Sequence, residues 1–106
     1  MSYTIAFIDD NECNFAIRFE DESLKDKVRQ YMQEGMTAWY CAAWSAEERK
    51  EYFEETYFTN EEVEGFYELG YTEPTCILLD RYGIKYELVD IKYNKNGEPV
   101  NVDEII

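Results

Sequence analysis

The sequence contains no histidine among its 106 residues. The commonest metal ligand and the usual proton shuttle near neutral pH are therefore both missing. No apolar run approaches the roughly 18 residues that a membrane-spanning helix needs. The first ten residues, MSYTIAFIDD, carry no basic segment before their apolar run, so we expect no signal peptide. We expect a cytoplasmic protein with no bound metal and no cofactor.

Cysteine is also scarce, and its pattern is uninformative. Cys13, Cys41 and Cys76 are odd in number and form no CxxC pair, which argues against structural disulfides and zinc ligation. We expect reduced and mostly buried thiols. A catalytic thiol usually needs a histidine or another cation beside it, so a thiol enzyme is poorly supported. Glutamate and aspartate are so abundant that no pair of residues stands out as a catalytic acid and base. An enzyme that works through carboxylates, tyrosine or a thiol is an alternative that stays open.

Basic residues are few. Ten Lys and Arg face 24 Asp and Glu, which gives a net charge of −14. That charge opposes binding to nucleic acid and to anionic membranes, which are themselves negative. A disordered acidic tail would be poor in aromatic residues, whereas this chain has six Phe, two Trp and ten Tyr. We therefore expect one compact domain over residues 1–106.

The negative charge is concentrated in one third of the chain. Residues 47–80 contain eleven acidic and two basic residues, a net charge of −9 out of −14. No basic residue lies between Lys50 and Arg81. The charge distribution therefore predicts one polarised face.

Local patterns predict strands before this region. Residues 3–8 are rich in β-branched and aromatic side chains, and residues 13–20 alternate between apolar and polar. Together they predict a β-hairpin. A helix is expected from Ser23, which can cap it, to Gly35, which is suited to ending it. Residues 37–44 are apolar and fit either a short buried strand or a helical segment.

Two capping boxes predict the central helices. Ser45 with Glu48 begins a helix that we expect to reach about Tyr57, and Thr59 with Glu62 begins another that should stop near Gly70.

The C-terminal third favours β-structure. After Pro74 we expect strands at 75–80, 84–93 and 99–103, with a turn at Asn96-Gly97. A helix over 75–80, ended by Gly83, is the alternative for the first of these. The expected fold is α+β: an N-terminal β-hairpin, two to three central acidic helices and a C-terminal antiparallel β-meander.

The central helices carry the candidate binding residues. The helix dipole stabilises acidic residues in the first turn of a helix, but it does not explain the acidic residues further along that lack basic partners. Like charges without partners repel one another and lower stability. Duplex DNA presents about one negative charge per 1.7 Å of axis, so these helices suit a basic nucleic-acid-binding partner. The alternative is a solvated acidic face that only aids solubility. The candidate glutamates are Glu47, Glu48, Glu51, Glu54, Glu55, Glu61, Glu62, Glu64 and Glu68.

Aromatic residues alternate with these glutamates, and about half of them should be core. Tyr52, Tyr57 and Tyr67 are candidate interface anchors, because a tyrosine is large and stiff with a polar tip. Trp39 and Trp44 are expected in the core.

A second acidic cluster, Asp9, Asp10 and Glu12, offers oxygen ligands but lacks the spacing of an EF-hand. We interpret it as a hairpin turn and not as a cation site.

The segment AWYCAAWSAEERKEYFEETYFTNEEVEGFYELGY, residues 38–71, resembles acidic helical segments of small DNA-mimic inhibitors of phages and mobile elements, of the anti-CRISPR and antirestriction type. The resemblance implies stoichiometric inhibition of a nucleic-acid-binding protein or nuclease, without catalysis. The protein would be a monomer or homodimer in the host cytoplasm. Two alternatives remain open: an immunity protein that neutralises a basic toxin nuclease, and an acidic structural or assembly subunit.

Overall fold

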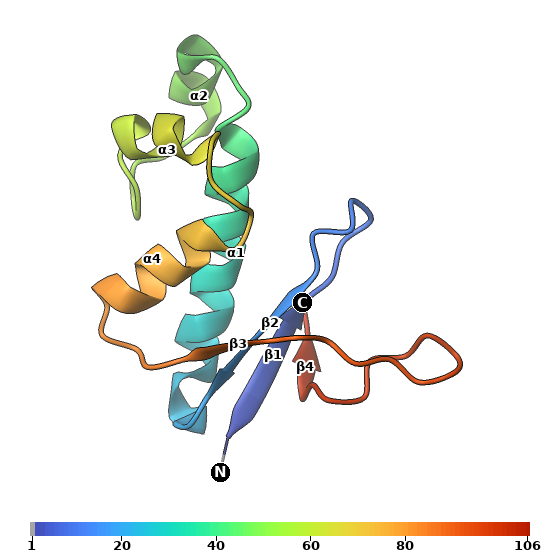
Figure 1. Ribbon diagram of the computed structural model, residues 1–106. Coiled ribbons are helices and arrows are strands. Elements are labelled where there is room, and N and C mark those ends of the chain that lie inside the picture. Colours follow the sequence, from blue (N-terminus) through green and yellow to red (C-terminus); the bar gives the residue numbers. More distant parts are fainter. Residues whose placement is uncertain (1) are drawn as a thin grey trace.

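The computed structural model describes residues 2–106, except for the side chain of Tyr52. Four α-helices gather on one side of a four-stranded sheet (Figure 1). Buried apolar side chains from sheet and helices form one core cluster, to which Ile5, Phe15, Val28, Val63 and Leu78 belong. The expected α+β class is confirmed. Within residues 2–106, no helix is both long enough and apolar enough to span a membrane.

The N-terminal hairpin is confirmed, with strands slightly shorter than predicted. β1 (Tyr3–Phe7) pairs antiparallel with β2 (Phe15–Phe19). The turn between them is held by Asp9, whose carboxylate accepts the backbone N–H groups of Asn11 at 3.1 Å and Cys13 at 2.9 Å. The acidic cluster at 9–12 is therefore a hairpin turn, as interpreted from the sequence.

The prediction of a C-terminal antiparallel meander is wrong. The strand order is β3-β2-β1-β4, in which β3 (Glu87–Val89) pairs antiparallel with β2, and β4 (Glu104–Ile105) pairs parallel with β1. Residues 90–103 lead from one edge of the sheet to the other. The predicted turn at Asn96-Gly97 is present at the tip of this connection, where Gly97 has a φ of +77° and Tyr93 forms a bridge with Pro99.

The first long helix passes through the residue that we expected to end it. A short 3₁₀ turn (Glu22–Leu24), capped by Asp21 and not by Ser23, leads into α1 (Lys25–Cys41). The ambiguous segment 37–44 is helical as far as Cys41. Gly35 is buried within α1, where a Cβ atom would stand 2.4 Å from Oγ1 of Thr75. Glycine is needed there for close packing, not for ending the helix.

The strand expected at 75–80 is also wrong, because these residues belong to α4 (Glu73–Arg81). The buried positions Pro74, Thr75, Leu78 and Leu79 recur at helical spacing and so share one face. Packing of this face outweighs the β-propensity of the Thr-Cys-Ile segment. The alternative from the sequence, a helix ended by Gly83 with a φ of +72°, is what the structure contains.

Both predicted capping boxes are present. Ser45 and Glu48 begin α2 (Ala46–Tyr52), and Thr59 and Glu62 begin α3 (Asn60–Phe66). Each helix ends earlier than expected. α2 stops because Phe53 is extended, with φ −113° and ψ 123°, and its side chain packs against the core.

An ion pair fastens the C-terminal strand to α1. Arg29 donates through Nε and Nη2 to the Glu104 carboxylate, the latter at 2.8 Å, and the Tyr3 hydroxyl donates to the same carboxylate at 2.9 Å. The guanidinium holds the pKa of Glu104 below its ordinary value of 4.5, against the opposing effect of burial.

This lowered pKa gives an expected pH dependence. Because the pKa of Glu104 is lower in the folded chain than in the unfolded chain, its stabilisation is present above the unfolded value and is lost as the pH falls through the folded value. Glu104→Gln should lower the free energy of unfolding at pH 7 by about 1 kcal/mol. Urea denaturation should show this difference shrinking below about pH 4. A difference that stays constant with pH would contradict the assignment, and the exposed Glu98→Gln serves as the control.

Candidate acidic binding surface

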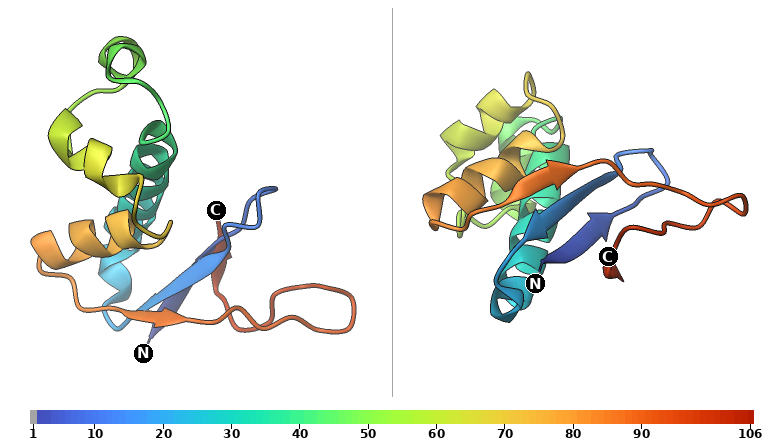
Figure 2. Two further views of the ribbon diagram at one scale, coloured as in Figure 1. Left: turned by 45° about the horizontal axis from the view of Figure 1, so that its top comes forward. Right: turned by 60° about the horizontal axis from the view of Figure 1, so that its bottom comes forward.

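The predicted glutamates lie on α2, α3 and the segments after each helix, at the opposite end of the molecule from the loop around Gly97 (Figures 1 and 2). We call these nine residues the acidic surface: Glu47, Glu48, Glu51, Glu54, Glu55, Glu61, Glu62, Glu64 and Glu68. All are exposed except Glu62, which is half-buried. Glu54 and Glu55 lie after the end of α2 and Glu68 lies after the end of α3, so their predicted place on a helix is wrong.

A buried arginine holds the two helices together. Arg49 of α2 is only 2% exposed. Its guanidinium donates to the backbone carbonyl of Trp44 at 2.6 Å, to Glu64 of α3 at 2.9 Å and more weakly to the Asn60 side chain at 3.4 Å. Sequence reasoning missed this residue, because nothing in the spacing of one arginine among glutamates shows that it points inward.

A second arginine reaches the acidic surface from α4. Arg81 donates to Glu62 at 2.6 Å and to the backbone carbonyl of Tyr57 at 2.9 Å. The Thr59 backbone N–H and then the Arg81 guanidinium hold the pKa of Glu62 below its ordinary value. The expectation that these helices lack basic partners is therefore wrong for Glu62 and Glu64.

Local hydrogen bonds occupy two more of the nine carboxylates. Glu48 closes the capping box with Ser45, and Glu55 accepts the backbone N–H of Asn60 at 2.7 Å. The remaining five make no hydrogen bond or ion pair with any side chain or backbone group that the structure describes. We call them the unpaired glutamates: Glu47, Glu51, Glu54, Glu61 and Glu68.

The three predicted tyrosine anchors lie in different environments. Tyr67 is 71% exposed beside the acidic surface. Tyr57 is half-buried, and its ring makes edge-to-face contacts with Tyr31 and Tyr82, so it packs mainly against other residues of the protein. The side chain of Tyr52, the third predicted anchor, lies outside the described part of the chain.

The two tryptophans also differ. Trp39 packs against the core as expected, and its indole N–H donates to the Leu69 carbonyl at 3.0 Å. Trp44 is 39% exposed in the turn after α1, so its expected place in the core is wrong.

An aromatic groove that the sequence did not indicate lies next to Tyr67. Trp39 and Tyr40 near the C-terminal end of α1 and Ala43 in the turn after it line the groove together with Tyr67, and its volume is about 140 Å³. The spacing of Trp39, Tyr40 and Ala43 is the helical signal that could have placed them on one face. Tyr67 joins them only through the packing of α3 against α1.

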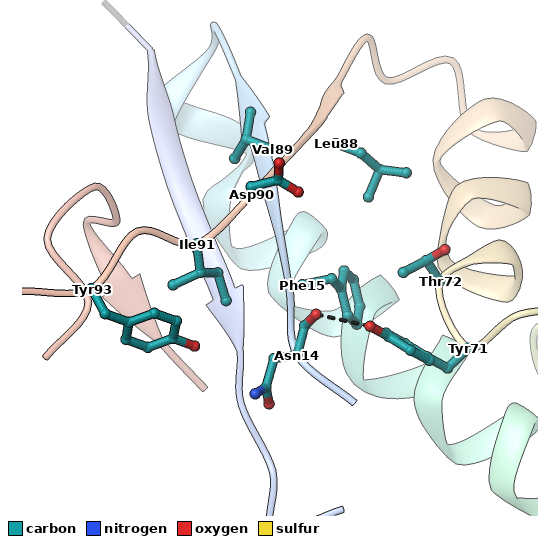
Figure 3. Close-up of a pocket in the computed structure, with 9 residues that line it drawn as sticks. All are labelled: Asn14, Phe15, Tyr71, Thr72, Leu88, Val89, Asp90, Ile91 and Tyr93. Atoms are coloured by element: carbon teal, nitrogen blue, oxygen red, sulfur yellow. Dashed lines mark hydrogen bonds between the residues drawn. The ribbon is translucent and has the colours of Figure 1, made fainter. Parts of the chain in front are cut away.

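A larger groove of about 510 Å³ lies between the start of β2, the residues just before α4, and β3 with the connection that follows it (Figure 3). Across it, the Tyr71 hydroxyl donates to the backbone carbonyl of Asn14 at 3.0 Å. Asp90 is the only carboxylate among the described residues that line it, and none of those residues is Lys, Arg or Cys. The lining therefore offers no paired acid and base.

Two of the three thiols do not resemble activated nucleophiles. Cys13, Cys41 and Cys76 are free within the described chain. Burial raises the pKa of the Cys41 and Cys76 thiols, which disfavours the reactive thiolate. Among residues 2–106, no group of three or more Cys, Asp or Glu side chains is arranged to hold a metal ion.

The acidic surface is thus an exposed end of the molecule that two arginines hold in shape and five unpaired glutamates dominate. Searches among protein-family models, curated proteins and solved structures found no match to this chain.

Proposed function

We propose that this protein is a non-catalytic inhibitor that binds a basic nucleic-acid-binding protein or nuclease and occupies its DNA- or RNA-binding channel. The observation that carries the proposal is the set of five unpaired glutamates at one end of the molecule. Such a protein contacts no nucleic acid or membrane itself, and it acts in the cytoplasm where its target meets nucleic acid.

The internal arrangement of charge supports this proposal. Arg49 and Arg81 each bind one glutamate of the acidic surface and donate to a backbone carbonyl, so both stabilise the helix positions. The unpaired glutamates repel one another on the same end of the protein, which lowers stability. A basic partner removes that repulsion on binding, so the charge that weakens the free protein strengthens the complex.

The charge also favours rapid association. Residues 81–106 carry a net charge of only −1, whereas residues 47–80 carry −9. A basic channel shaped for a polyanion attracts the end of the molecule that holds this charge and orients it on approach. Salt screens exposed charges, so the affinity should fall as ionic strength rises.

The test compares two variants of equal net charge. The first changes the five unpaired glutamates to glutamine. The second changes five exposed carboxylates elsewhere to their amides: Glu20, Glu22, Glu73, Asp90 and Glu98. Fluorescence anisotropy with a labelled deca-arginine peptide, a minimal basic partner, measures the affinity of each. The first variant should bind about 30-fold more weakly than the unmodified protein, since exposed ion pairs contribute about 0.4 kcal/mol each. The second should lose less than about threefold, because its changes leave the acidic surface intact.

Capture from a host lysate extends the test to natural partners. The unmodified protein and the second variant should retain nucleic-acid-binding proteins that duplex DNA releases, and the first variant should not. Equal retention by both variants, or no retained protein at low salt, would overturn the proposal.

A further inference from the structure

The aromatic groove beside the acidic surface has the form of a site for a cationic side chain. Three of its four lining residues, Trp39, Tyr40 and Tyr67, are aromatic. Aromatic faces attract cations through their electron density, and tryptophan does so most strongly. Ala43 has a small side chain that leaves the groove open.

A carboxylate is bound to one of the lining residues. The Tyr40 hydroxyl donates to the Asp9 carboxylate. This hydrogen bond raises the pKa of Tyr40 to about 12 and lowers that of Asp9, so the hydroxyl stays neutral and the carboxylate stays charged. In the sequence, Tyr67 is followed by Glu68, one of the unpaired glutamates. None of the described residues that line the groove is a cation.

Much of the wall is rigid. Trp39 is held by its hydrogen bond to the Leu69 carbonyl and by an edge-to-face contact with Tyr40, with ring centroids 5.4 Å apart at 68°. Tyr40 is held in turn by Asp9 and also accepts from the Asn11 side chain at 3.3 Å. A wall that is already ordered loses little entropy on binding, which favours affinity. Tyr67 forms the solvent-exposed side of the groove.

We propose that this groove receives an arginine side chain of the basic partner. The inference rests on the proposed function, because it assigns one anchoring contact to the same complex. Arginine fits better than lysine, since its planar guanidinium stacks on aromatic rings and donates in its own plane to carboxylates. Charge on the acidic surface attracts the partner, and the groove fixes one residue of it in place.

The experiment compares deca-arginine with deca-lysine, which carry the same charge. Tyr67→Ala should weaken the binding of deca-arginine about fivefold and leave deca-lysine within about twofold. Tyr67→Phe keeps the ring and should bind as the unmodified protein does. Tyr93→Ala removes an exposed tyrosine from the distant 90–103 connection and should change neither affinity. Melting curves confirm that each variant is folded.

Ala43→Leu gives an independent test, because it fills the groove without changing charge. It should weaken deca-arginine binding as Tyr67→Ala does. If both variants bind deca-arginine normally while the five-glutamate variant loses affinity, the arginine groove is wrong and the proposed function stands. If the five-glutamate variant also binds normally, the proposed function fails and this inference fails with it.

Discussion

Replacing Arg49 with alanine should lower the free energy of unfolding by about 2–3 kcal/mol, because it removes two strong hydrogen bonds from a buried cation. The bonds to Trp44 at 2.6 Å and Glu64 at 2.9 Å join α2 to the turn after α1 and to α3. Chemical denaturation measures the destabilisation. Hydrogen exchange should show the amides of α2 losing protection more than those of β1 and β2, since the Arg49 side chain fastens α2 to its neighbours and does not touch the hairpin.

Two substitutions serve as controls for this prediction. Lys50→Ala removes the neighbouring exposed cation and should change stability by less than about 0.5 kcal/mol. Arg49→Lys keeps the charge but lacks the planar fork that reaches two partners, so it should lose part of the stability. If Arg49→Ala is no more destabilising than Lys50→Ala, the buried arginine does not hold the helices together.

The second large effect is expected at Gly35. Alanine normally favours a helix over glycine by about 1 kcal/mol. At Gly35, however, a Cβ atom would stand 2.4 Å from Thr75 Oγ1, 2.7 Å from its backbone nitrogen and 2.9 Å from its Cα. Because backbone atoms are involved, rotation of the threonine side chain cannot relieve the contact, and α4 must move away from α1. Gly35→Ala should therefore lower stability by a net of about 2 kcal/mol.

Gly65 in α3 provides a matched control. A Cβ atom there would meet nothing within 4 Å. Gly65→Ala should raise stability by about 0.5–1 kcal/mol, as expected for an open helical position. Thermal denaturation should place the Gly35→Ala melting temperature roughly 8–16 °C lower than that of the unmodified protein. Similar melting temperatures for the two variants would contradict the close helix packing.

Structural features that depend on neighbouring residues were predicted correctly, and features that depend on residues far apart in the sequence were not. The capping boxes at Ser45 and Thr59 were predicted correctly, because a cap depends on residues three positions apart. The strand prediction at 75–80 is wrong because α4 packs against α1 and buries Leu78 and Leu79, and local β-propensity contains no information on that packing. The parallel pairing of β4 was missed because it joins residues about 100 positions apart, as Ile5 with Glu104.

The sequence by itself determined the α+β class, the N-terminal hairpin, the two capped helices and the concentration of negative charge in residues 47–80. These features depend on composition and on spacings of a few residues, which the chain displays directly. Only the tertiary structure decided which glutamates are paired, since Arg81 reaches Glu62 from another helix and Arg49 turns inward to Glu64. It also decided that Tyr67 completes a groove with Trp39 and Tyr40. Pairing and grooves depend on where helices meet, and long-range burial of apolar surface sets those positions.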